Sequence, residues 1–350
     1  MSANEPPETG PPEASEAQSE NDVKSIDALR EAYTVKTEMG KVIHGQHEVI
    51  EKLLICIFAR GHGLLMGVPG LAKTMMVNSL AEIMSLQFSR IQFTPDLMPS
   101  DITGTDILQE TETAGRRAFE FVKGPIFANT ILADEINRTP PKTQAALLQA
   151  MQEMQITVMG KTYELEQPFF VLATQNPIEQ EGTYPLPEAQ LDRFMFFIQV
   201  AYPNREEELL IARTTTGSTP PPLNEILGRE EILDFQQAVR RVPVPNHVYD
   251  YVVDLVRRSR PNAEDAPDWV KSWVTWGAGP RAVQYLILGG KARAALSGSY
   301  MVRMEDVDAI TREVLTHRIL LSFHAESEGV SSSDVIVRLT DEVKKHHAAA

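Results

Sequence analysis

The sequence predicts a three-layer α/β fold, in which a five-stranded parallel sheet lies between helices, followed by a smaller all-helical domain. Five short runs of apolar or alternating residues indicate buried strands. Helical segments separate most of these runs, and strands that alternate with one-faced helices are typical of a parallel sheet covered on both faces. The expected strands cover residues 63–66, 88–93, 130–133, 169–174 and 195–200.

The chain before the first strand divides into two parts. Residues 1–22 contain five Glu, one Asp and four Pro but no Lys, Arg or aromatic residue, a composition that cannot bury enough apolar surface to fold. We expect a disordered acidic tail there, most simply a solvated leader without a role of its own. From Ser25 the spacing becomes helical and continues through Ile57 to a break at Gly61 and Gly63.

Two helices between the strands are predicted to have one apolar face. Their apolar residues recur at i, i+3, i+4 and i+7, a spacing that aligns side chains along one side of a helix. The residues are Val77, Leu80, Ala81 and Met84 in the first helix, and Leu147, Ala150, Met151 and Met154 in the second.

Two segments are predicted to form hairpins outside the sheet. Residues 106–110 and 118–122 flank a polar turn, and residues 155–159 are expected to pair with residues 162–166. Gly160 and Lys161 would connect the second pair. Glycine suits the first position of a type II′ turn, so we expect that turn to begin at Gly160.

Strand signals stop after Pro203, and prolines punctuate the helical pattern that follows. We therefore expect a core domain over residues 23–204, an all-helical lid over 205–330 and a C-terminal tail over 331–350. Trp269, Trp273 and Trp276 are the only tryptophans and fall at i, i+4 and i+7. This spacing predicts that all three pack in the core of the small domain.

Composition excludes several classes of protein. The net charge is -15 and the pI about 5.1, so the surface as a whole should repel a nucleic-acid backbone. Cys56 is the single cysteine and cannot form an intramolecular disulfide. No run reaches the ~18 apolar residues of a membrane span, and the N-terminus has no basic, apolar signal region. We expect a cytoplasmic protein without membrane insertion.

A candidate phosphate-binding loop lies between the first strand and the first amphipathic helix. Backbone N–H groups and the helix N-terminus would hold phosphates there, Lys73 would reach the β and γ groups, and the Thr74 hydroxyl would hold Mg²⁺. Ala72 stands where such loops usually have glycine, and its methyl group is tolerable only if the local φ is negative. The loop consists of Gly67, Val68, Pro69, Gly70, Leu71, Ala72, Lys73 and Thr74.

Polar residues end two further strands, at the edge of a parallel sheet where ligand sites form. Asp134 suits coordination of Mg²⁺, directly or through water, and Glu135 suits activation of an attacking water. The amide of Asn176 could orient that water against the γ-phosphate. Solvated turn residues are the alternative, but the phosphate-binding loop on a neighbouring strand makes a functional role more probable.

Two arginines are candidates for contact with nucleotide. Arg193 directly precedes the fifth strand and could act as an arginine finger, and Arg281 opens a helix of the second domain and could sense nucleotide there. An arginine at either position could equally serve in a structural ion pair, and sequence alone leaves these alternatives open.

Together these segments resemble the MoxR family of AAA+ ATPases over roughly residues 25–335. The resemblance lies in the loop at 67–74, LADEINR at 132–138, ATQNP at 173–177, LPEAQLDRF at 186–194 and GPR at 279–281. Alanine before the lysine is familiar in this family. The resemblance implies these roles: Walker A for Lys73 and Thr74, Walker B for Asp134 and Glu135, sensor 1 for Asn176, a trans-acting finger for Arg193 and sensor 2 for Arg281.

The resemblance also implies ATP and Mg²⁺ as cofactors and a ring of identical subunits, usually hexameric, with the sites between subunits. It implies a helix-2 insertion and a hairpin before sensor 1, which match the two expected hairpins. The implied role is chaperone-like remodelling or maturation of protein complexes, in some cases with insertion of metals or cofactors. A partner protein with a von Willebrand factor A domain often accompanies this role.

Two other functions fit parts of the sequence. The ATPase could be a metal-chelatase motor or a DNA-remodelling machine, although the acidic charge argues against DNA and residues 102–122 lack a GAFTGA loop. The chain could instead be a nucleotide-switched scaffold with little turnover, which Glu135, Asn176 and Arg193 speak against.

Overall fold

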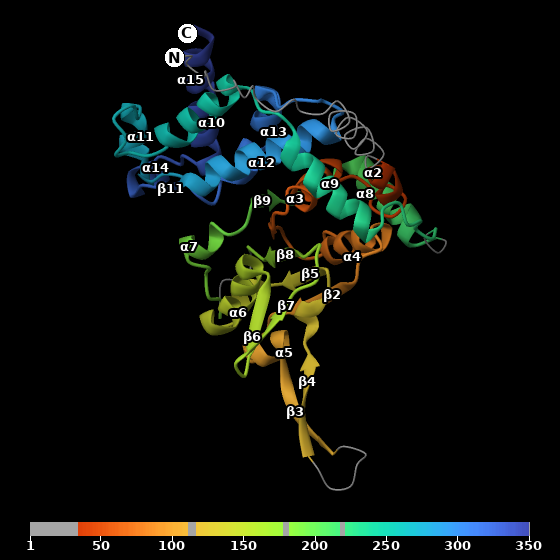
Figure 1. The fold of residues 1–350 in the computed structure, drawn as a ribbon. Coiled ribbons are helices and arrows are strands. Elements are labelled where there is room, and N and C mark those ends of the chain that lie inside the picture. The colour runs from red at the N-terminus through yellow and green to blue at the C-terminus, as the bar shows by residue number, and fades with distance from the viewer. Residues whose placement is uncertain (1–33, 111–116, 178–181, 218–220, 350) are drawn as a thin grey trace, which may run out of the picture.

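The computed structural model describes residues 34–110, 117–177, 182–217 and 221–349. The expected acidic tail, residues 1–22, lies outside the described residues. Figure 1 shows a sheet-containing core with a hairpin extending from one end and a group of helices at the other.

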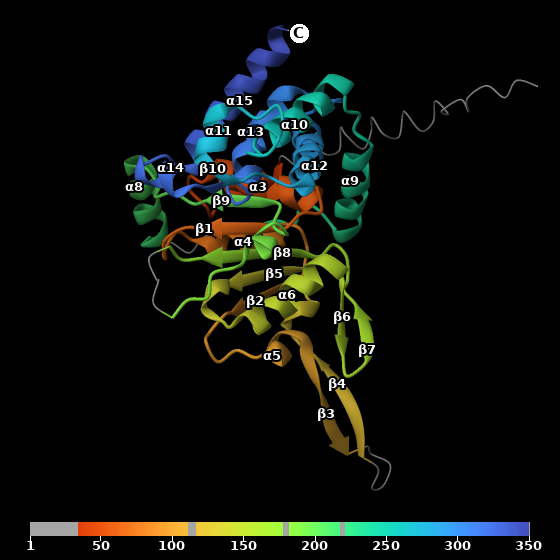
Figure 2. The same ribbon diagram turned by 90° about the vertical axis from the view of Figure 1, so that its left-hand side faces the viewer.

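The five predicted strands form one parallel sheet, as expected. Its strands are β1 (Gly63–Met66), β2 (Phe88–Gln92), β5 (Thr130–Asp134), β8 (Phe170–Gln175) and β9 (Phe196–Gln199). They lie in the order β2-β5-β8-β1-β9, and every neighbouring pair is parallel. Figure 2 shows them stacked from β9 at the top to β2 at the bottom. All five carboxyl ends therefore meet at one edge.

Helices cover both faces of this sheet, which confirms the three-layer architecture. Alternate residues of a strand point to opposite faces: Leu65 and Leu132 pack under α3 and α4, whereas Leu64 and Ile131 pack under α6. The helices and short helical turns of the core are α2 (Thr34–Met39), α3 (His47–Phe58), α4 (Lys73–Ile83), α5 (Pro99–Thr103), η1 (Pro125–Phe127), η2 (Ile136–Arg138), α6 (Pro141–Glu153) and α7 (Glu188–Leu191).

Both predicted hairpins are present. The long hairpin pairs β3 (Gly104–Glu110) with β4 (Arg117–Lys123) and extends away from the core (Figure 2). The short hairpin pairs β6 (Gln155–Val158) with β7 (Lys161–Glu164). Phe121 of the first stacks on Tyr163 of the second, with ring centroids 4.3 Å apart, so the base of one hairpin supports the other.

The turn of the short hairpin differs from the expectation. Val158 pairs with Lys161, so Met159 and Gly160 form the loop, one position before the expected one. Both have positive φ, 50° and 80°, which defines a type I′ turn rather than type II′. This turn matches the right-handed twist of the strands, and glycine occupies its second central position.

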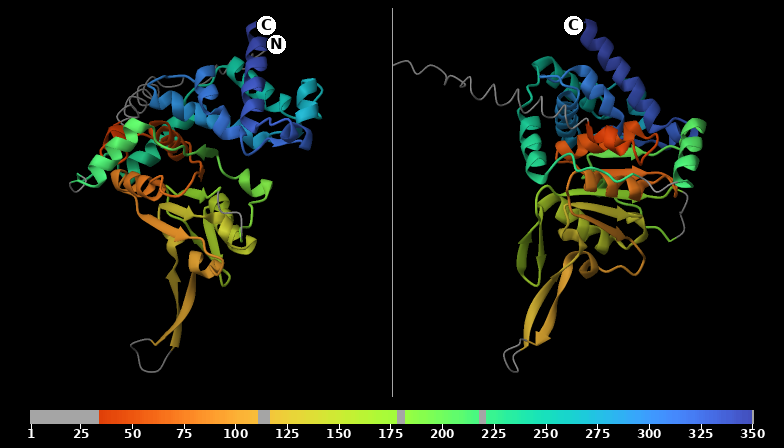
Figure 3. Two further views of the ribbon diagram at one scale, coloured as in Figure 1. Left: turned by 180° about the vertical axis from the view of Figure 1, so that it is seen from behind. Right: turned by 90° about the vertical axis from the view of Figure 1, so that its right-hand side faces the viewer.

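The second domain is mostly helical. Figure 3 shows its helices gathered at the end of the molecule opposite the long hairpin. Its α9 packs against α3 of the core, and one hydrophobic cluster continues from the sheet face under α3 into the lid. The helices are α8 (Arg205–Thr215), α9 (Arg229–Arg241), α10 (Asn246–Arg258), α11 (Asp268–Trp273), α12 (Pro280–Leu296), α13 (Met304–Leu315), α14 (Phe323–Ser327) and α15 (Ser332–Ala349).

Three expectations for this domain are corrected. The domain is not all-helical, because β10 (Val274–Trp276) pairs with β11 (Leu320–Leu321). Residues 331–350 are not a separate tail, because α15 buries Val335 and Leu339 and packs on α10 and α13. The three tryptophans do not share a helix face: α11 ends at Trp273, and Trp276 lies in a strand and is 67% exposed.

Within the described ranges, no helix is long and apolar enough to cross a membrane. Cys56 is buried on α3 among apolar side chains.

The buried side chain of His62 joins the start of β1 to the neighbouring strand β8 and to α6. Its Nδ1 accepts a hydrogen bond from the Val171 N–H at 3.1 Å, and its Nε2 lies 3.2 Å from the Met151 carbonyl oxygen. An Nδ1 that accepts is unprotonated, so the ring is neutral. Burial lowers the pKa of His62 to about 4, although the hydrogen bond to Met151 opposes this shift.

We predict that His62 weakens the fold in acid. Its pKa is lower in the folded chain than in the unfolded chain, so the free energy of unfolding should fall as pH drops from about 6.5 to about 4, by roughly 3 kcal/mol at most. His62→Gln should flatten this slope in denaturant unfolding measured across that range. His247→Gln, at an exposed position, should leave the slope unchanged. An identical slope for His62→Gln and the natural chain would contradict this role.

Candidate functional site

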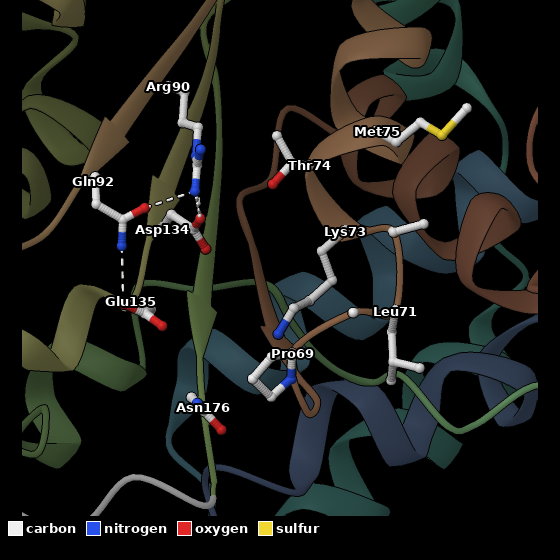
Figure 4. A pocket seen from close by; sticks show the side chains of 12 residues that line it. Pro69, Leu71, Lys73, Thr74, Met75, Arg90, Gln92, Asp134, Glu135 and Asn176 are labelled. Atoms are coloured by element: carbon white, nitrogen blue, oxygen red, sulfur yellow. Dashed lines mark hydrogen bonds and ion pairs between the residues drawn. The ribbon is translucent and has the colours of Figure 1, made fainter.

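A cavity of about 480 Å³ lies at the carboxyl edge of the sheet, where β1, β2, β5 and β8 end. Figure 4 shows Lys73 and Asp134 facing each other across it. Most of the predicted site residues line this cavity, together with two residues of β2. The lining residues are Pro69, Gly70, Leu71, Ala72, Lys73, Thr74, Met75, Arg90, Gln92, Asp134, Glu135 and Asn176.

The loop from Gly67 to Thr74 joins β1 to α4, as predicted. Gly70 has φ of 87°, in the region that favours glycine. Ala72 also has a positive φ, 53°, which contradicts the expectation that its methyl group requires a negative φ. A left-handed alanine costs about 1–2 kcal/mol, and the surrounding turn has to supply this stabilisation. In return, α4 begins directly at Lys73, with its first N–H groups directed at the cavity.

Lys73 reaches back along the loop. Its Nζ donates a hydrogen bond to the Gly67 carbonyl oxygen at 2.5 Å. Burial lowers the pKa of the Lys73 ammonium group, and the charges of Asp134 and Glu135 oppose that shift. The lysine is therefore a cation inside the cavity, attached to a neutral acceptor that a phosphate oxygen could replace.

Asp134 is held by two neighbours. The Thr174 hydroxyl donates to Oδ1 at 2.6 Å, and the Arg90 guanidinium donates to Oδ2 at 2.5 and 3.2 Å. Thr174 is buried and accepts the Glu135 N–H at 2.9 Å, so one hydroxyl fixes the backbone of one acid and the side chain of the other. The carboxylate thus faces the cavity at the end of β5.

The oxygen donors of the cavity fit Mg²⁺. The Thr74 hydroxyl and the Asp134 carboxylate line the same space, and Mg²⁺ prefers one or two such ligands combined with phosphate oxygens and water. Within the described part of the chain, no group of three or more His, Cys, Asp or Glu side chains could hold a metal ion. Phosphate oxygens and water would complete the shell of a metal held by Thr74 and Asp134.

Glu135 lies beside Asp134 in an unusual backbone conformation. Its φ of 57° and ψ of 49° are left-handed, which turns the chain sharply into η2. Its Oε2 accepts hydrogen bonds from Gln92 Nε2 at 2.9 Å and Arg138 Nη1 at 2.8 Å. These contacts hold the carboxylate at the cavity wall, which also includes Asn176, a buried residue directly after β8.

Arg193 and Arg281 lie elsewhere. Both line a second cavity, of about 210 Å³, together with His62 and Tyr285. The backbone N–H of Met195 donates to the His62 carbonyl oxygen at 2.8 Å, so this cavity adjoins the amino ends of β1 and β9. The phosphate-binding loop follows the opposite end of β1, and four strand residues span roughly 13 Å. The two arginines therefore occupy the other edge of the sheet.

Sequence left open whether each arginine contacts nucleotide or forms a structural ion pair, and the structure shows different partners for the two. Arg281 does form an ion pair, with Asp192 at 2.7 Å. Arg193 Nη1 donates instead to the Leu148 carbonyl oxygen at 2.7 Å. The two residues share one cavity, so they form a pair of cations beside each other.

Sequence reasoning missed Arg90 and Gln92, which line the first cavity, and Thr174, which binds Asp134 from outside that lining. Arg90 and Gln92 lie at i and i+2 of β2, hence on the same face of that strand. Two polar side chains on one face of a strand are a usable signal, but only the order of strands places β2 beside β5. Thr174 precedes the candidate Asn176 by two residues and could have been noticed for that reason.

The two acids lie at the end of β5, which β8 separates from β1, so they do not lie on the strand next to the loop as expected. A glycine-containing loop at a helix N-terminus, two acids at the same edge of the sheet and a helical lid define a nucleotide-binding protein of the AAA+ class. The comparisons with known proteins agree. Residues 62–196 match the model described as ATPase family associated with various cellular activities (AAA), and residues 268–339 match the AAA lid domain.

Whole-chain relatives narrow the class to a family. Chaperone MoxR1 of Mycobacterium tuberculosis is 44% identical over 87% of this chain and 80% of its own. Protein MoxR of Methylorubrum extorquens is 30% identical over 81% and 86%. A crystal structure of a candidate ATPase from Cytophaga hutchinsonii superposes with a TM-score of 0.85 at 42% identity, covering 92% of this chain and 97% of that one. The chain belongs to the MoxR family of AAA+ ATPases.

We predict that the Thr174 hydroxyl is required for nucleotide hydrolysis. Thr174→Val keeps the shape of the side chain but leaves the Glu135 N–H and one Asp134 oxygen without this partner. The loss of such buried partners should lower kcat about tenfold while KM for ATP changes little. Thr174→Ser, which restores the hydroxyl, should recover most of the rate in a phosphate-release assay. Equal rates for the valine and serine variants would contradict this role.

Proposed function

We propose that this chain hydrolyses ATP to ADP and phosphate at the cavity on the carboxyl edge of its sheet. One observation carries the proposal: Lys73, Asp134, Glu135 and Asn176 line a single cavity that opens at the amino end of α4. This set provides a phosphate-binding cation, a metal-binding acid, a candidate general base and an amide in one place.

Binding of ATP uses the loop and the start of α4. Backbone N–H groups in the first turn of a helix have no intrahelical acceptor, so they bind phosphate oxygens well. Lys73 would exchange the Gly67 carbonyl oxygen for the β- and γ-phosphates. Mg²⁺, held by Thr74 and Asp134, would neutralise charge on those phosphates. For this, Asp134 has to release Arg90, which now occupies one of its oxygens.

Hydrolysis then depends on the acids and the amide at the ends of β5 and β8. Glu135 would accept the proton of the attacking water, and Asn176 would orient that water toward the γ-phosphate. Gln92 and Arg138 already hold the Glu135 carboxylate at the cavity wall. Holding the acid in place before the reaction lowers the entropic part of the barrier.

The remaining cations come from a neighbouring subunit in this proposal. Arg193 and Arg281 adjoin the amino edge of their own sheet, opposite the loop that would bind ATP. A ring of identical subunits, hexameric as in related families, would bring this edge of one chain to the nucleotide cavity of the next. Such an arginine contributes ~10³ to 10⁵ in rate, so an isolated chain would hydrolyse ATP slowly.

We further propose a chaperone-like role in the remodelling or maturation of a protein complex. The name of the relative Chaperone MoxR1 supports this role. The long hairpin also exposes apolar side chains that a client protein could cover: Leu108 and Phe119 pair across the strands and are 51% and 70% exposed. A partner with a von Willebrand factor A domain, and insertion of metals or cofactors, are part of the same proposal.

Two substitutions should separate binding from turnover. Glu135→Gln should bind ATP tightly with hydrolysis arrested, because the amide cannot accept the proton of the attacking water. Arg193→Ala should retain ATP binding and lose about 10³-fold in turnover, because it removes transition-state charge. Binding of a fluorescent ATP analogue and release of phosphate, measured on the same preparations, report the two properties.

Arg257→Ala is the matched control, because Arg257 is half-exposed on α10 of the lid and its ion pair with Asp265 is long, 3.9 Å. It should behave like the natural chain in both assays. Full activity of Arg193→Ala would eliminate the finger assignment, and unchanged turnover of Glu135→Gln would eliminate the proposed base.

A further inference from the structure

We propose that Tyr285 and Arg318, which we call the finger clamp, are positioning residues through which the lid of one subunit sets the place of Arg193. This inference rests on the proposed function, in which Arg193 serves a neighbouring site. The finger clamp belongs to the lid, since Tyr285 lies on α12 and Arg318 lies between α13 and β11. Arg193 belongs to the core, three residues before the start of β9.

Arg318 binds the chain on both sides of Arg193. Its side chain is 2% exposed. Nε donates to Asp192 Oδ1 at 2.7 Å, and Nη2 donates to the carbonyl oxygens of Asp192 and Phe194 at 2.8 and 2.7 Å. Nη1 donates to the carbonyl oxygens of Met195 and Val314 at 3.3 and 2.5 Å. Four of these five contacts reach residues 192–195, across the boundary between lid and core.

Tyr285 holds Arg193 itself. Its hydroxyl donates to the Arg193 carbonyl oxygen at 3.1 Å. The guanidinium of Arg318 lies over the Tyr285 ring, 5.1 Å from its centroid, so the two members of the finger clamp also fix each other. His317 adds a contact from the lid, with Nε2 at 3.0 Å from the Phe194 carbonyl oxygen.

Asp192 joins the finger clamp to Arg281, the second candidate nucleotide contact. Its Oδ1 accepts from Arg318, and its Oδ2 forms the 2.7 Å ion pair with Arg281. Burial lowers the pKa of the Arg318 guanidinium, whereas the charge and hydrogen bond of Asp192 raise it. Arg318 has enough acceptors around it to stay charged, so the carboxylate is shared between two cations.

The finger clamp does more than stabilise the contact between lid and core, because it also links the position of the lid to that of Arg193. A buried arginine that only joined two domains could bind any part of the core, but these contacts concentrate on the four residues that contain the finger. A rotation of the lid must therefore move the Arg193 backbone or break several hydrogen bonds at once. We infer that movement of the lid in one subunit changes catalysis at the adjacent subunit's nucleotide, with little effect on its own.

Complementation between subunits tests this inference. Arg318→Met keeps an unbranched side chain, although a shorter one, and removes its donors. Alone it should bind ATP with KM within about threefold of the natural value and lose about 10- to 100-fold in kcat, the range expected for a misplaced catalytic group. Lys73→Ala should be inactive because it cannot bind phosphate, although its Arg193 and finger clamp remain intact.

Mixed assemblies of the two variants, co-expressed with different tags and purified by both, should recover activity. In a random equal mixture, about one junction in four combines an intact loop with an intact clamped finger, so roughly a quarter of the natural turnover is expected. Tyr285→Phe removes only the hydroxyl that binds Arg193 and should show a smaller loss with the same recovery. Arg257→Met should not alter turnover at all.

The mixture of Arg193→Ala with Lys73→Ala separates two claims: that Arg193 acts on the neighbouring subunit, and that the finger clamp positions it. If this mixture recovers activity and the mixtures with Arg318→Met and Tyr285→Phe do not, the finger works between subunits but the clamp does not position it, and the inference is overturned. If the Arg193→Ala mixture itself stays inactive, the proposed sharing of sites between subunits is wrong. If Arg318→Met does not fold, the mixture of Tyr285→Phe with Lys73→Ala provides the test.

Discussion

Parallel strands place all carboxyl ends at one edge of a sheet and all amino ends at the other, and the functional organisation of this chain depends on that constraint. The loop after β1 and the acids after β5 meet at the first edge. Arg193, which precedes β9, is confined to the second, so its distance from the loop is set by the sheet itself. In the proposed function, a complete site with both sets of residues requires two copies of the chain.

The lid contacts the core at the amino edge of the sheet, where Arg193 lies. Its hydrophobic core is continuous with the sheet face under α3, which joins the two domains by apolar packing. Polar contacts fix one particular segment of the core at this junction, because Arg318 and Tyr285 bind the residues around Arg193. Loss of a partner from a buried, hydrogen-bonded charge is costly, so Asp192 and Arg318 are expected to remain together as the lid moves.

The sequence was sufficient for features encoded locally and insufficient for those that depend on strand order or on distant contacts. The five strands, both hairpins and the loop could be predicted, because each follows from periodicity or from glycine placement. The left-handed Ala72 was misjudged, since the turn around it overrides its own preference. Gln92 reaches Glu135 only because β2 adjoins β5, and Arg318 meets Asp192 across 126 positions. Neither contact produces a pattern among neighbouring residues from which it could be predicted.

Phosphate release per subunit, measured from dilute to concentrated protein together with molecular mass by sedimentation, tests most directly whether the site is shared between chains. If the two edges of the sheet belong to one site in an assembly, specific activity should rise in step with assembly and level off when the ring is complete. Specific activity that stays constant while the mass changes from one subunit to several would contradict the account.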